Sequence, residues 1–504
     1  MPSFRLPPFV RKPTVLALVF MLELVVALAL LSSSTGLNGW KLGNPAPDNV
    51  DVQLSEQQPG ASGDAVSPLP AALAAQLHQL AQHRQNQARR RPLALVFVGT
   101  RPEVIKMAPL VHEMQENSVN SHVFDTIVVS TGQHREMLAQ TLRGFDLKID
   151  LGLSVMQHNQ NLGALFAAVV AQSTAVIASL RPEVVLVQGD TSTALACATA
   201  AYYERVPVAH VEAGLRSFDF NHPFPEEMNR RAIDSFATFH FAPTEYAAEA
   251  IRRENTCARN IVVTGNTGVD AVLARLNADP PAAARRLIAQ LQTCTGGACD
   301  VNDAPPVIIL VTSHRRENLG EPLESICRAV KRIVEDNPVV RVVFPVHLNP
   351  NVQKVVFAHL KNVDRITLTD PLDYDVLTYL LQEVTIVLSD SGGLQEEAVS
   401  IGKPVVLLRQ TTERPEGVYA GTVRLAGTNE DRVVSDTQNV IDNLVEYHQR
   451  IKGQNVFGDG AASGRIANVL RQYLAADSAQ RRKYLAPCTQ EKQAELANVV
   501  YGHS

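Results

Sequence analysis

The chain has 504 residues, of which 45% are hydrophobic and 19% charged, and its formal net charge is −5 at pH 7. This length corresponds to about two or three domains, and the composition excludes disordered and collagen-like proteins. The small negative net charge gives no support to nucleic-acid binding. Six cysteines are too few for a disulfide framework, and no CxxC pair or HExxH string predicts a zinc site.

An apolar run from Val15 to Leu31, interrupted only by Glu23, lies close to the N-terminus and follows three basic residues, Arg5, Arg11 and Lys12. As a helix it would be about 25 Å long, slightly short of the ~30 Å hydrocarbon core, so a single span with snorkelling ends is feasible. The flanking cations favour a cytoplasmic N-terminus. We therefore predict that residues 1–36 form a cytoplasmic tail and membrane anchor.

A cleaved signal peptide and a soluble tail are the alternatives to this anchor, because small polar residues follow the apolar run. With an anchor the body of the protein would be lumenal or extracytoplasmic; with a cleaved signal it would be secreted, and with a soluble tail cytoplasmic. Residues 37–91 are rich in Pro, Gln, Ala and Ser and are predicted to form a stalk. Leu73, Leu77 and Leu80 suggest one short helix within it.

Short apolar runs ending in polar residues repeat from Leu93 onward, each followed by a loop and a stretch long enough for a helix. Such runs are typical of parallel strands that are buried on both faces. In the first half they are LALVFVG, DTIVVST, EVVLVQGD, VPVAHVE, ATFHFAPT and NIVVTGN. We predict an N-terminal Rossmann-like domain over residues 92–278.

A segment containing several Pro, Ala and Gly residues follows at 279–306 and is predicted to be a linker with an insertion. It contains Cys294 and Cys299 in the string TCTGGAC. In an exported protein these two residues could close a small disulfide loop. Two unpaired surface thiols are the alternative.

Five further runs, VIILVTS, VRVVFPV, RITLTD, VTIVLSD and PVVLLR, predict a second sheet, and we assign residues 307–475 to a C-terminal Rossmann-like domain. Residues 476–504 would form a polar tail. The fold class is therefore α/β, with two doubly wound domains. Because ligands of such sheets bind beyond the carboxyl ends of the strands, the active-site cleft should lie between the domains.

Two strand ends could bind an anion. GTRPEVIK places Arg101 and Lys106 near a helix N-terminus, and SDSGGLQEE opens a helix with Ser391, Gly392 and Gly393. Free backbone N–H groups, cations and glycines at such positions suit a phosphate group, although each motif alone could also be a solvated turn. No GxGxxG follows a strand and no GxxxxGK[ST] occurs, which disfavours tightly bound NAD and a P-loop.

Carboxylates follow strands of the first half. Asp190 ends VVLVQGD, Glu212 ends VPVAHVE, and Glu226 follows in HPFPEEMNR, so the three should meet at one edge of the sheet. Like charges raise one another's pKa, which makes a carboxylate a usable acid or base. N-caps and ion pairs with Arg216, Arg230 and Arg231 are the structural alternative. In the second half, His314 follows VIILVTS directly.

With these residues assembled, the chain from about Leu93 to Tyr473 resembles the non-hydrolysing UDP-N-acetylglucosamine 2-epimerases. The resemblance implies a glycosyltransferase-B-like arrangement of the two domains, a homodimer, no cofactor, and interconversion of UDP-GlcNAc and UDP-ManNAc through elimination and re-addition of UDP. It is carried by GTRPEVIKMAPL, STGQHREML, VQGDTST, HVEAGLRS, PFPEEMNR, TGNTGVD, TSHRRENLG, FPVHLNPNV, SDSGGLQEE, GKPVVLLR and TTERPEG, in this order.

The family's residue roles transfer to this chain through these motifs. The catalytic set that the resemblance implies is Asp190, Glu212, Glu226 and His314. The same resemblance implies that UDP and the sugar are bound by Arg101, Lys106, Asp190, Glu212, His314, Leu377, Ser391, Gly392, Gly393, Glu397 and Arg414. Where this chain has Leu377, members of the family often have Phe, so some packing near the uracil would be lost.

Members of the family are activated by a second UDP-GlcNAc, and the matching residues are Gln133, Arg315 and His347. Hydrolysing relatives, which release ManNAc and UDP, tend to lose this set, so we favour the non-hydrolysing reaction. A membrane-anchored nucleotide-sugar glycosyltransferase is an alternative enzyme, although it would not need three carboxylates opposite a nucleotide site. An anchored lectin-like protein without turnover is the non-enzymatic alternative, and the retained carboxylates argue against it.

Overall fold

The computed structural model describes residues 69–87, 90–132, 141–156, 160–254, 260–292 and 305–486. Several predictions therefore lie outside the described residues: the anchor over 1–36, the stalk up to residue 68, the disulfide between Cys294 and Cys299, the proposed role of Gln133, and the tail beyond residue 486.

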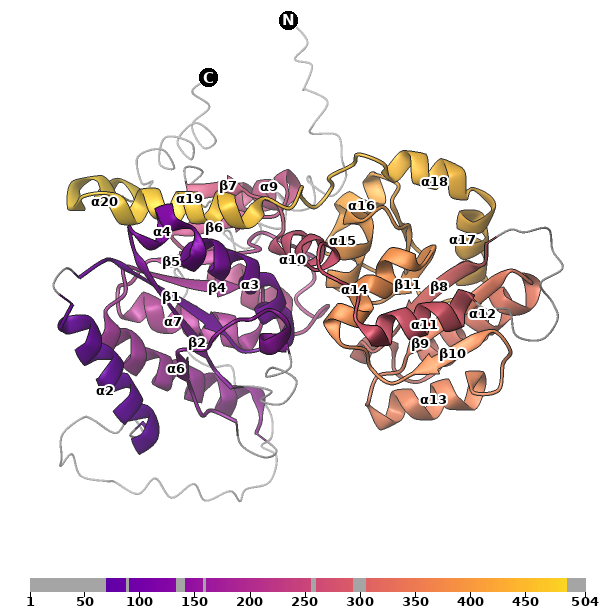
Figure 1. The fold of residues 1–504 in the computed structure, drawn as a ribbon, viewed down its shortest axis with the longest axis horizontal. Helices are drawn as coiled ribbons and strands as arrows, with labels where there is room; N and C mark the ends of the chain where they lie inside the picture. Colours follow the sequence, from indigo (N-terminus) through magenta and orange to yellow (C-terminus); the bar gives the residue numbers. More distant parts are fainter. Residues whose placement is uncertain are drawn as a thin grey trace, which may run out of the picture. The chain divides into compact units, whose positions relative to one another are not determined.

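Seven parallel strands of the described chain form the first sheet, in the order β3-β2-β1-β4-β5-β6-β7. Its central strands are continuous apolar runs buried on both faces, because helices cover the sheet from two sides (Figure 1). The strands are β1 Leu93–Val98, β2 Asp125–Ser130, β3 Leu151–Gly152, β4 Val184–Gln188, β5 Val208–Val211, β6 Phe239–Ala242 and β7 Ile261–Val263.

Most helices of this first lobe contribute to two hydrophobic cores, one on each face of the sheet, and α9 packs into a smaller third cluster. One core contains side chains of α3 and α10, and the other those of α2, α6, α7 and α8. The helices are α2 Ala71–Gln85, α3 Arg101–Glu116, α4 Ser118–Ser121, α6 Leu162–Leu180, α7 Ser192–Tyr203, α8 Glu226–Phe236, α9 Glu245–Arg253 and α10 Thr267–Leu276.

Among the described helices, α6 alone has the length and apolar composition needed to cross a membrane, with a mean hydropathy of 1.8. Its residues Leu165, Val169 and Ile177 belong to the core of the first lobe, and the helix contacts α2 and α7. The apolar composition of α6 is therefore accounted for, at least in part, by packing within this lobe.

Six parallel strands form the sheet of the second lobe among the described residues, in the order β10-β9-β8-β11-β12-β13. The strands are β8 Val307–Thr312, β9 Val340–Pro345, β10 Ile366–Thr369, β11 Ile386–Ser389, β12 Val405–Leu407 and β13 Val423–Leu425. The helices that follow α10 along the chain are α11 Ala282–Gln292, α12 Glu321–Asp336, α13 Pro350–Leu360, α14 Tyr374–Glu383, α15 Gly392–Ser400, α16 Pro415–Tyr419, α17 Glu430–Asp442, α18 Leu444–Ile451, α19 Ala462–Ala475 and α20 Ser478–Leu485, with a 3₁₀ turn at Arg316–Asn318.

The two parallel sheets confirm the predicted α/β architecture, and all eleven predicted strands are present. Two further strands, β3 and β13, span two and three residues and were not predicted. The segment expected to be a linker contains helix α11, which contacts α14.

Helix α19 also differs from the predicted division, which placed it with the second sheet. Its residues Ile466, Leu470 and Tyr473 are buried in the core of the first lobe, beside α3. The chain therefore returns to the first lobe after completing the second, and this crossing links the two lobes covalently a second time.

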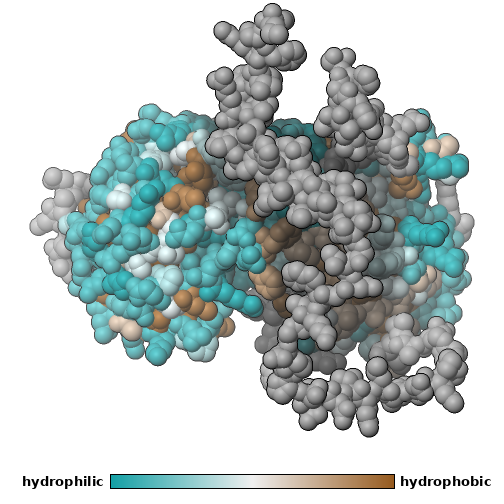
Figure 2. All heavy atoms as spheres, turned by 180° about the vertical axis from the view of Figure 1, so that it is seen from behind, coloured by the Kyte–Doolittle hydropathy of each residue, from teal (hydrophilic) through white to brown (hydrophobic). Residues whose placement is uncertain are grey.

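In Figure 2 the described surface of the second lobe is mainly hydrophilic, with small apolar groups between polar ones. Large apolar side chains that remain exposed include Tyr202 and Tyr203 at the end of α7, and Phe218 and Phe224 in the loop before α8. Exposed apolar residues are common on the surfaces of folded proteins.

Candidate active site

Helix α8 brings together the residues that surround Asp190. The helix starts at Glu226, and one turn later Asn229 and Arg230 point back to the end of β4. The Asn229 side chain donates to the Asp190 carbonyl oxygen at 2.8 Å, and the Arg230 guanidinium forms an ion pair with the Asp190 carboxylate. Asp190 therefore forms the ion pair that the sequence offered as the structural alternative to a catalytic role. Its side chain is still 25% exposed.

Glu226 lies in a different environment from its neighbour. Burial and the nearby negative charge of Asp190 raise the pKa of Glu226. Its Oε2 atom is buried and has no hydrogen-bond partner within the described chain. Asp190 is ion-paired with Arg230, whereas for Glu226 burial and the Asp190 charge outweigh the opposing charges of Arg315 and Arg230, so the two carboxyl groups lie in different electrostatic environments.

Glu212 occupies the end of β5 and is almost fully buried. The Lys106 ammonium forms an ion pair with its Oε2 atom, Asn266 donates to the same atom at 3.0 Å, and Arg414 donates to Oε1 at 3.4 Å. Burial alone would raise the pKa of Glu212, but the Lys106 and Arg414 charges outweigh it and lower the pKa. Glu212 also has a φ of 65°, a strained conformation for a residue with a Cβ.

The contacts of Glu212 extend across to the second lobe through Glu396 of α15. Asn266 donates to Glu396 Oε1 at 2.9 Å, and Arg414 Nε donates to the same oxygen at 2.5 Å. Lys106 Nζ lies 3.5 Å from Glu396 Oε2. Two cations and two carboxylates thus form one buried group to which both lobes contribute.

His314 lies at the end of β8, and its position is fixed by Asp390 at the end of β11. One oxygen of Asp390 accepts hydrogen bonds from the backbone N–H groups of His314 and Arg315, at 2.8 and 2.9 Å. The His314 ring stacks on His347, with a centroid distance of 5.4 Å and an interplanar angle of 11°. Burial and His314 lower the pKa of His347, so its ring is neutral at pH 7.

The N-terminus of α15 presents the predicted anion site. Ser391 caps the helix, with its Oγ accepting from Leu394 N at 3.4 Å. A Cβ on Gly392 would lie 2.7 Å from Arg414 Nη1, whereas a Cβ on Gly393 would meet nothing within 4 Å. Gly392 therefore makes room for Arg414, and the space beside Gly393 is open to a ligand.

Glu397 and Arg101 lie beside this helix end. Burial raises the pKa of Glu397 to about 7, and its Oε1 accepts from the Tyr374 hydroxyl at 3.3 Å. Arg101 Nη2, from the first lobe, donates to the Leu372 carbonyl oxygen at 3.3 Å. Leu377 is partly buried against the core of the second lobe.

The structure therefore brings the predicted residues into three groups: Asp190 with Glu226, Glu212 with Lys106 and Arg414, and His314 with His347. Arg315 connects the third group to the first, since its charge acts on the pKa of Glu226. Four residues that contribute to these groups were not singled out from the sequence, namely Asn266, Asp390, Glu396 and Glu413.

Glu413 is a buried carboxylate that pairs with Arg409 at 2.8 Å and with Arg414 at 2.5 Å. Burial opposes its ionisation, but the arginines hold its pKa well below the usual value. Its position in TTERPEG was visible in the sequence, yet only the folded chain shows that it fixes the Arg414 guanidinium.

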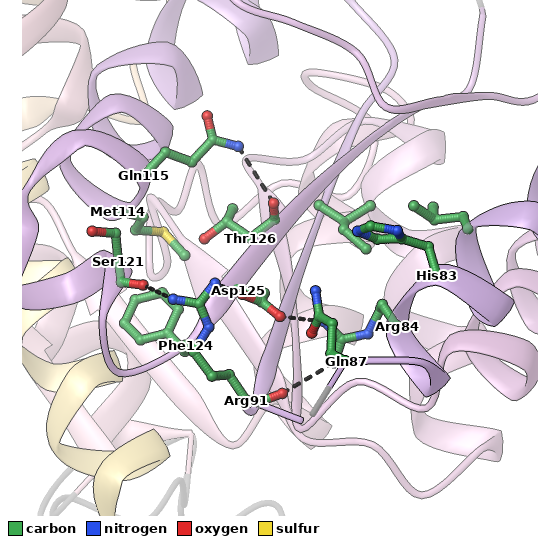
Figure 3. Close-up of a pocket in the computed structure, with 12 residues that line it drawn as sticks. His83, Arg84, Gln87, Arg91, Met114, Gln115, Ser121, Phe124, Asp125 and Thr126 are labelled. Carbon is green, nitrogen blue, oxygen red and sulfur yellow. Dashed lines mark hydrogen bonds and ion pairs between the residues drawn. The ribbon is translucent and has the colours of Figure 1, made fainter. Parts of the chain in front are cut away.

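A pocket of about 270 Å³ lies elsewhere, between α2 and the start of β2 (Figure 3). Arg84 and Arg91 both pair with Asp125, at 2.7 and 2.6 Å. Asp125 opens β2, so the pocket is at the amino end of that strand, whereas the candidate catalytic residues follow carboxyl ends. The paired charges attach α2 to the sheet, and we assign no catalytic role to this pocket.

Comparison with known proteins agrees with this arrangement. A sequence model described as UDP-N-acetylglucosamine 2-epimerase matches residues 117–471. UDP-N-acetylglucosamine 2-epimerases of Campylobacter jejuni and Escherichia coli K12 are 43% and 42% identical, over 75% of this chain and 96% and 98% of their own lengths. The structure of the Neisseria meningitidis UDP-GlcNAc 2-epimerase bound to UDP-GlcNAc is similar, with 39% identity, a TM-score of 0.68, and coverage of 76% of this chain and all of that one.

Proposed function

The chain belongs to the UDP-N-acetylglucosamine 2-epimerase family, and on this basis we propose that it interconverts UDP-GlcNAc and UDP-ManNAc without hydrolysis. The observation that carries the proposal is the buried group formed by Glu212, Lys106, Arg414 and Glu396, to which both lobes contribute. It provides cations and carboxylates at one place beside the open N-terminus of α15.

The chemical problem is the proton at C2, which is not adjacent to a carbonyl group and is therefore weakly acidic. Elimination solves it: a base takes the C2 proton while the C1–O bond breaks, and UDP leaves with the electron pair. The product, 2-acetamidoglucal, then takes up a proton at C2 from the opposite face as UDP adds back to C1. The route needs a base, an acid, and stabilisation of UDP as a leaving group.

The pair of Asp190 and Glu226 suits the two proton transfers. Asp190 forms an ion pair with Arg230, while burial and the charge of Asp190 raise the pKa of Glu226. One carboxylate can thus accept a proton while the other donates one, as two neighbouring carboxyl groups with different environments do in other enzymes. Glu212, held ionised by Lys106 and Arg414, is the third candidate.

Departure of UDP places additional negative charge on the diphosphate, and cations contact that charge more strongly in the transition state than in the substrate. Lys106, Arg414 and the free N–H groups of α15 are the donors available for this purpose. His314 would lie near the departing phosphate, and Glu397 would accept hydrogen bonds from the ribose. Ligand entry would exchange part of the present ion pairing for contacts with UDP.

Arg315 and His347 support the non-hydrolysing outcome, because both match the family's residues for binding a second, activating UDP-GlcNAc. His347 stacks directly on His314. A second UDP-GlcNAc bound at His347 would thus act next to a candidate catalytic residue. We expect His347→Ala to weaken activation by substrate while preserving basal turnover.

Product analysis tests the proposal. Purified protein incubated with UDP-GlcNAc alone should form UDP-ManNAc up to an equilibrium mixture, followed by NMR of the nucleotide sugars. Stoichiometric release of ManNAc and UDP would instead identify a hydrolysing enzyme. Turnover only after addition of a sugar acceptor would identify a glycosyltransferase.

A further inference from the structure

A histidine that takes no part in the proposed chemistry lies buried between the loops that carry Asp190 and Glu212. His210 is on β5, two residues before Glu212, and is fully inaccessible to solvent. Its Nε2 atom lies 2.7 Å from the Gly189 carbonyl oxygen, and its Nδ1 atom lies 2.6 Å from Asp234 Oδ1. Gly189 directly precedes Asp190.

Both contacts of His210 require the ring nitrogen to donate. A backbone carbonyl oxygen has no proton to give, so Nε2 must carry one. Asp234 also accepts from Gly214 N at 3.1 Å and from Arg216 Nη2 at 2.8 Å, and such contacts favour its ionised form. With Asp234 ionised, Nδ1 must donate as well, and the ring carries both protons.

The neighbouring strand provides a contrasting histidine. His240 pairs in register with His210 and is equally buried, but only its Nε2 has a partner, the Asp234 carbonyl oxygen at 2.9 Å. Its Nδ1 atom has no hydrogen-bond partner among the residues that the structure describes, and burial lowers the pKa of His240. The charged and titratable groups facing His210 are therefore Asp234 of α8, Arg216 of the following loop, and neutral His240.

We propose that His210 and Asp234 form a buried imidazolium–carboxylate couple that positions both the Gly189–Asp190 turn and the loop following Glu212. His210 fixes Gly189, and Asp234 fixes Gly214 and Arg216. Helix α8, which also carries Glu226, Asn229 and Arg230, thereby connects all three candidate catalytic carboxylates. The catalytic consequence rests on the proposed function, whereas the protonation state does not.

Nitrogen NMR of the full chain, labelled at histidine, tests the charge directly. The two ring nitrogens of His210 should both show shifts of protonated nitrogen from pH 6 to 8, and His240 should show one protonated and one bare nitrogen. His210→Gln and His240→Gln assign the signals. A bare nitrogen in His210 at pH 7 would overturn the proposal, whether or not the protein is an epimerase.

Kinetics of the same variants test the positioning role. The single amide nitrogen of Gln cannot replace donors at two separate ring nitrogens, so His210→Gln should lower kcat by about 100-fold, with the KM for UDP-GlcNAc and the affinity for UDP nearly unchanged. His240→Gln, a matched buried control that keeps one donor, should retain kcat within about threefold. Equal losses in both histidine variants, or a wild-type kcat in His210→Gln, would contradict the role.

Asp234→Asn gives a second variant that does not depend on how well His210→Gln folds. It should reduce kcat by a similar factor, and the double variant should lose no more than either single one, because the two residues act as a unit. Multiplying losses in the double variant would show that they act independently and would defeat the proposed couple.

Discussion

At the scale of single residues, chemically similar carboxylates lie in different electrostatic environments. Arg230 compensates Asp190, two cations lower the pKa of Glu212, and burial beside Asp190 raises the pKa of Glu226. Residue types at strand ends were predictable from the sequence, because a polar residue directly after an apolar run is visible there. The electrostatic environments of these carboxylates were not predictable, since their partners lie up to 202 positions away along the chain.

Asp190→Asn should remove most turnover without loss of UDP binding. The amide cannot take a proton, while UDP would be bound by the second lobe and by Lys106. We expect kcat to fall by about 100-fold or more, measured by UDP-ManNAc formation, with calorimetry giving the affinity for UDP. Activity close to that of the wild type would end the assignment of Asp190 as an acid or base.

Glu397 should make binding of UDP-GlcNAc depend on pH. Its pKa in the free protein is about 7, and ribose hydroxyls donating to the carboxylate would favour the ionised form and lower that pKa. Binding then releases a proton, so affinity should rise with pH up to about 7 and level off above it. Calorimetry of the Asp190→Asn variant in buffers of different ionisation enthalpy measures the released proton.

Glu397→Gln in the same background is the control, because it removes the titrating group and keeps the size of the side chain. It should bind with no such pH dependence. An identical pH profile in both proteins would show that Glu397 does not contact the ligand.

At the scale of elements, two short helices carry much of the site. Helix α8 supports the carboxylates of the first lobe, and α15 offers free N–H groups in the second. The Ser-Gly-Gly start of α15 was predictable as an anion site, but Asp390 just before it was not recognised. Asp390 accepts from the loop after β8, a contact between segments 75 residues apart that no local pattern reveals.

Gly392 and Gly393 should respond differently to alanine. In Gly392→Ala the new Cβ would collide with the Arg414 guanidinium, so we expect a loss of about 1–3 kcal/mol in stability together with slower turnover. Gly393→Ala has open space and should keep its Tm, while its methyl group enters the volume proposed for the diphosphate and weakens UDP binding. Thermal unfolding and UDP titrations of both variants distinguish stability from binding. Unchanged UDP affinity in Gly393→Ala would show that the diphosphate does not bind beside Gly393.

At the scale of the whole molecule, both lobes and the candidate site lie within residues 69–486. The alternation of strands and helices was predictable, whereas the return of α19 to the first lobe was not, because an amphipathic helix does not reveal which core it will cover. The membrane anchor and the homodimer remain proposals. The apolar run over 15–31 supports the first, and the family resemblance supports the second.

Membrane association should depend on the first 68 residues alone. The full chain is expected to sediment with membranes, and a chain beginning at residue 69 should remain in solution with the same epimerase activity, since the described lobes are retained. Protease protection in sealed vesicles then gives the side on which the body lies. A full-length chain that stays in solution, or one whose N-terminus starts just after the apolar run, would contradict the anchor.

Solvent isotope incorporation tests the central claim, elimination and re-addition of UDP within one site formed by both lobes. The protein is incubated with UDP-GlcNAc in deuterium oxide, and the two nucleotide sugars are analysed by NMR and mass spectrometry. We predict that UDP-ManNAc carries one deuterium at C2 and that recovered UDP-GlcNAc gains it as the mixture approaches equilibrium. UDP-ManNAc that retains the original C2 proton would contradict the account.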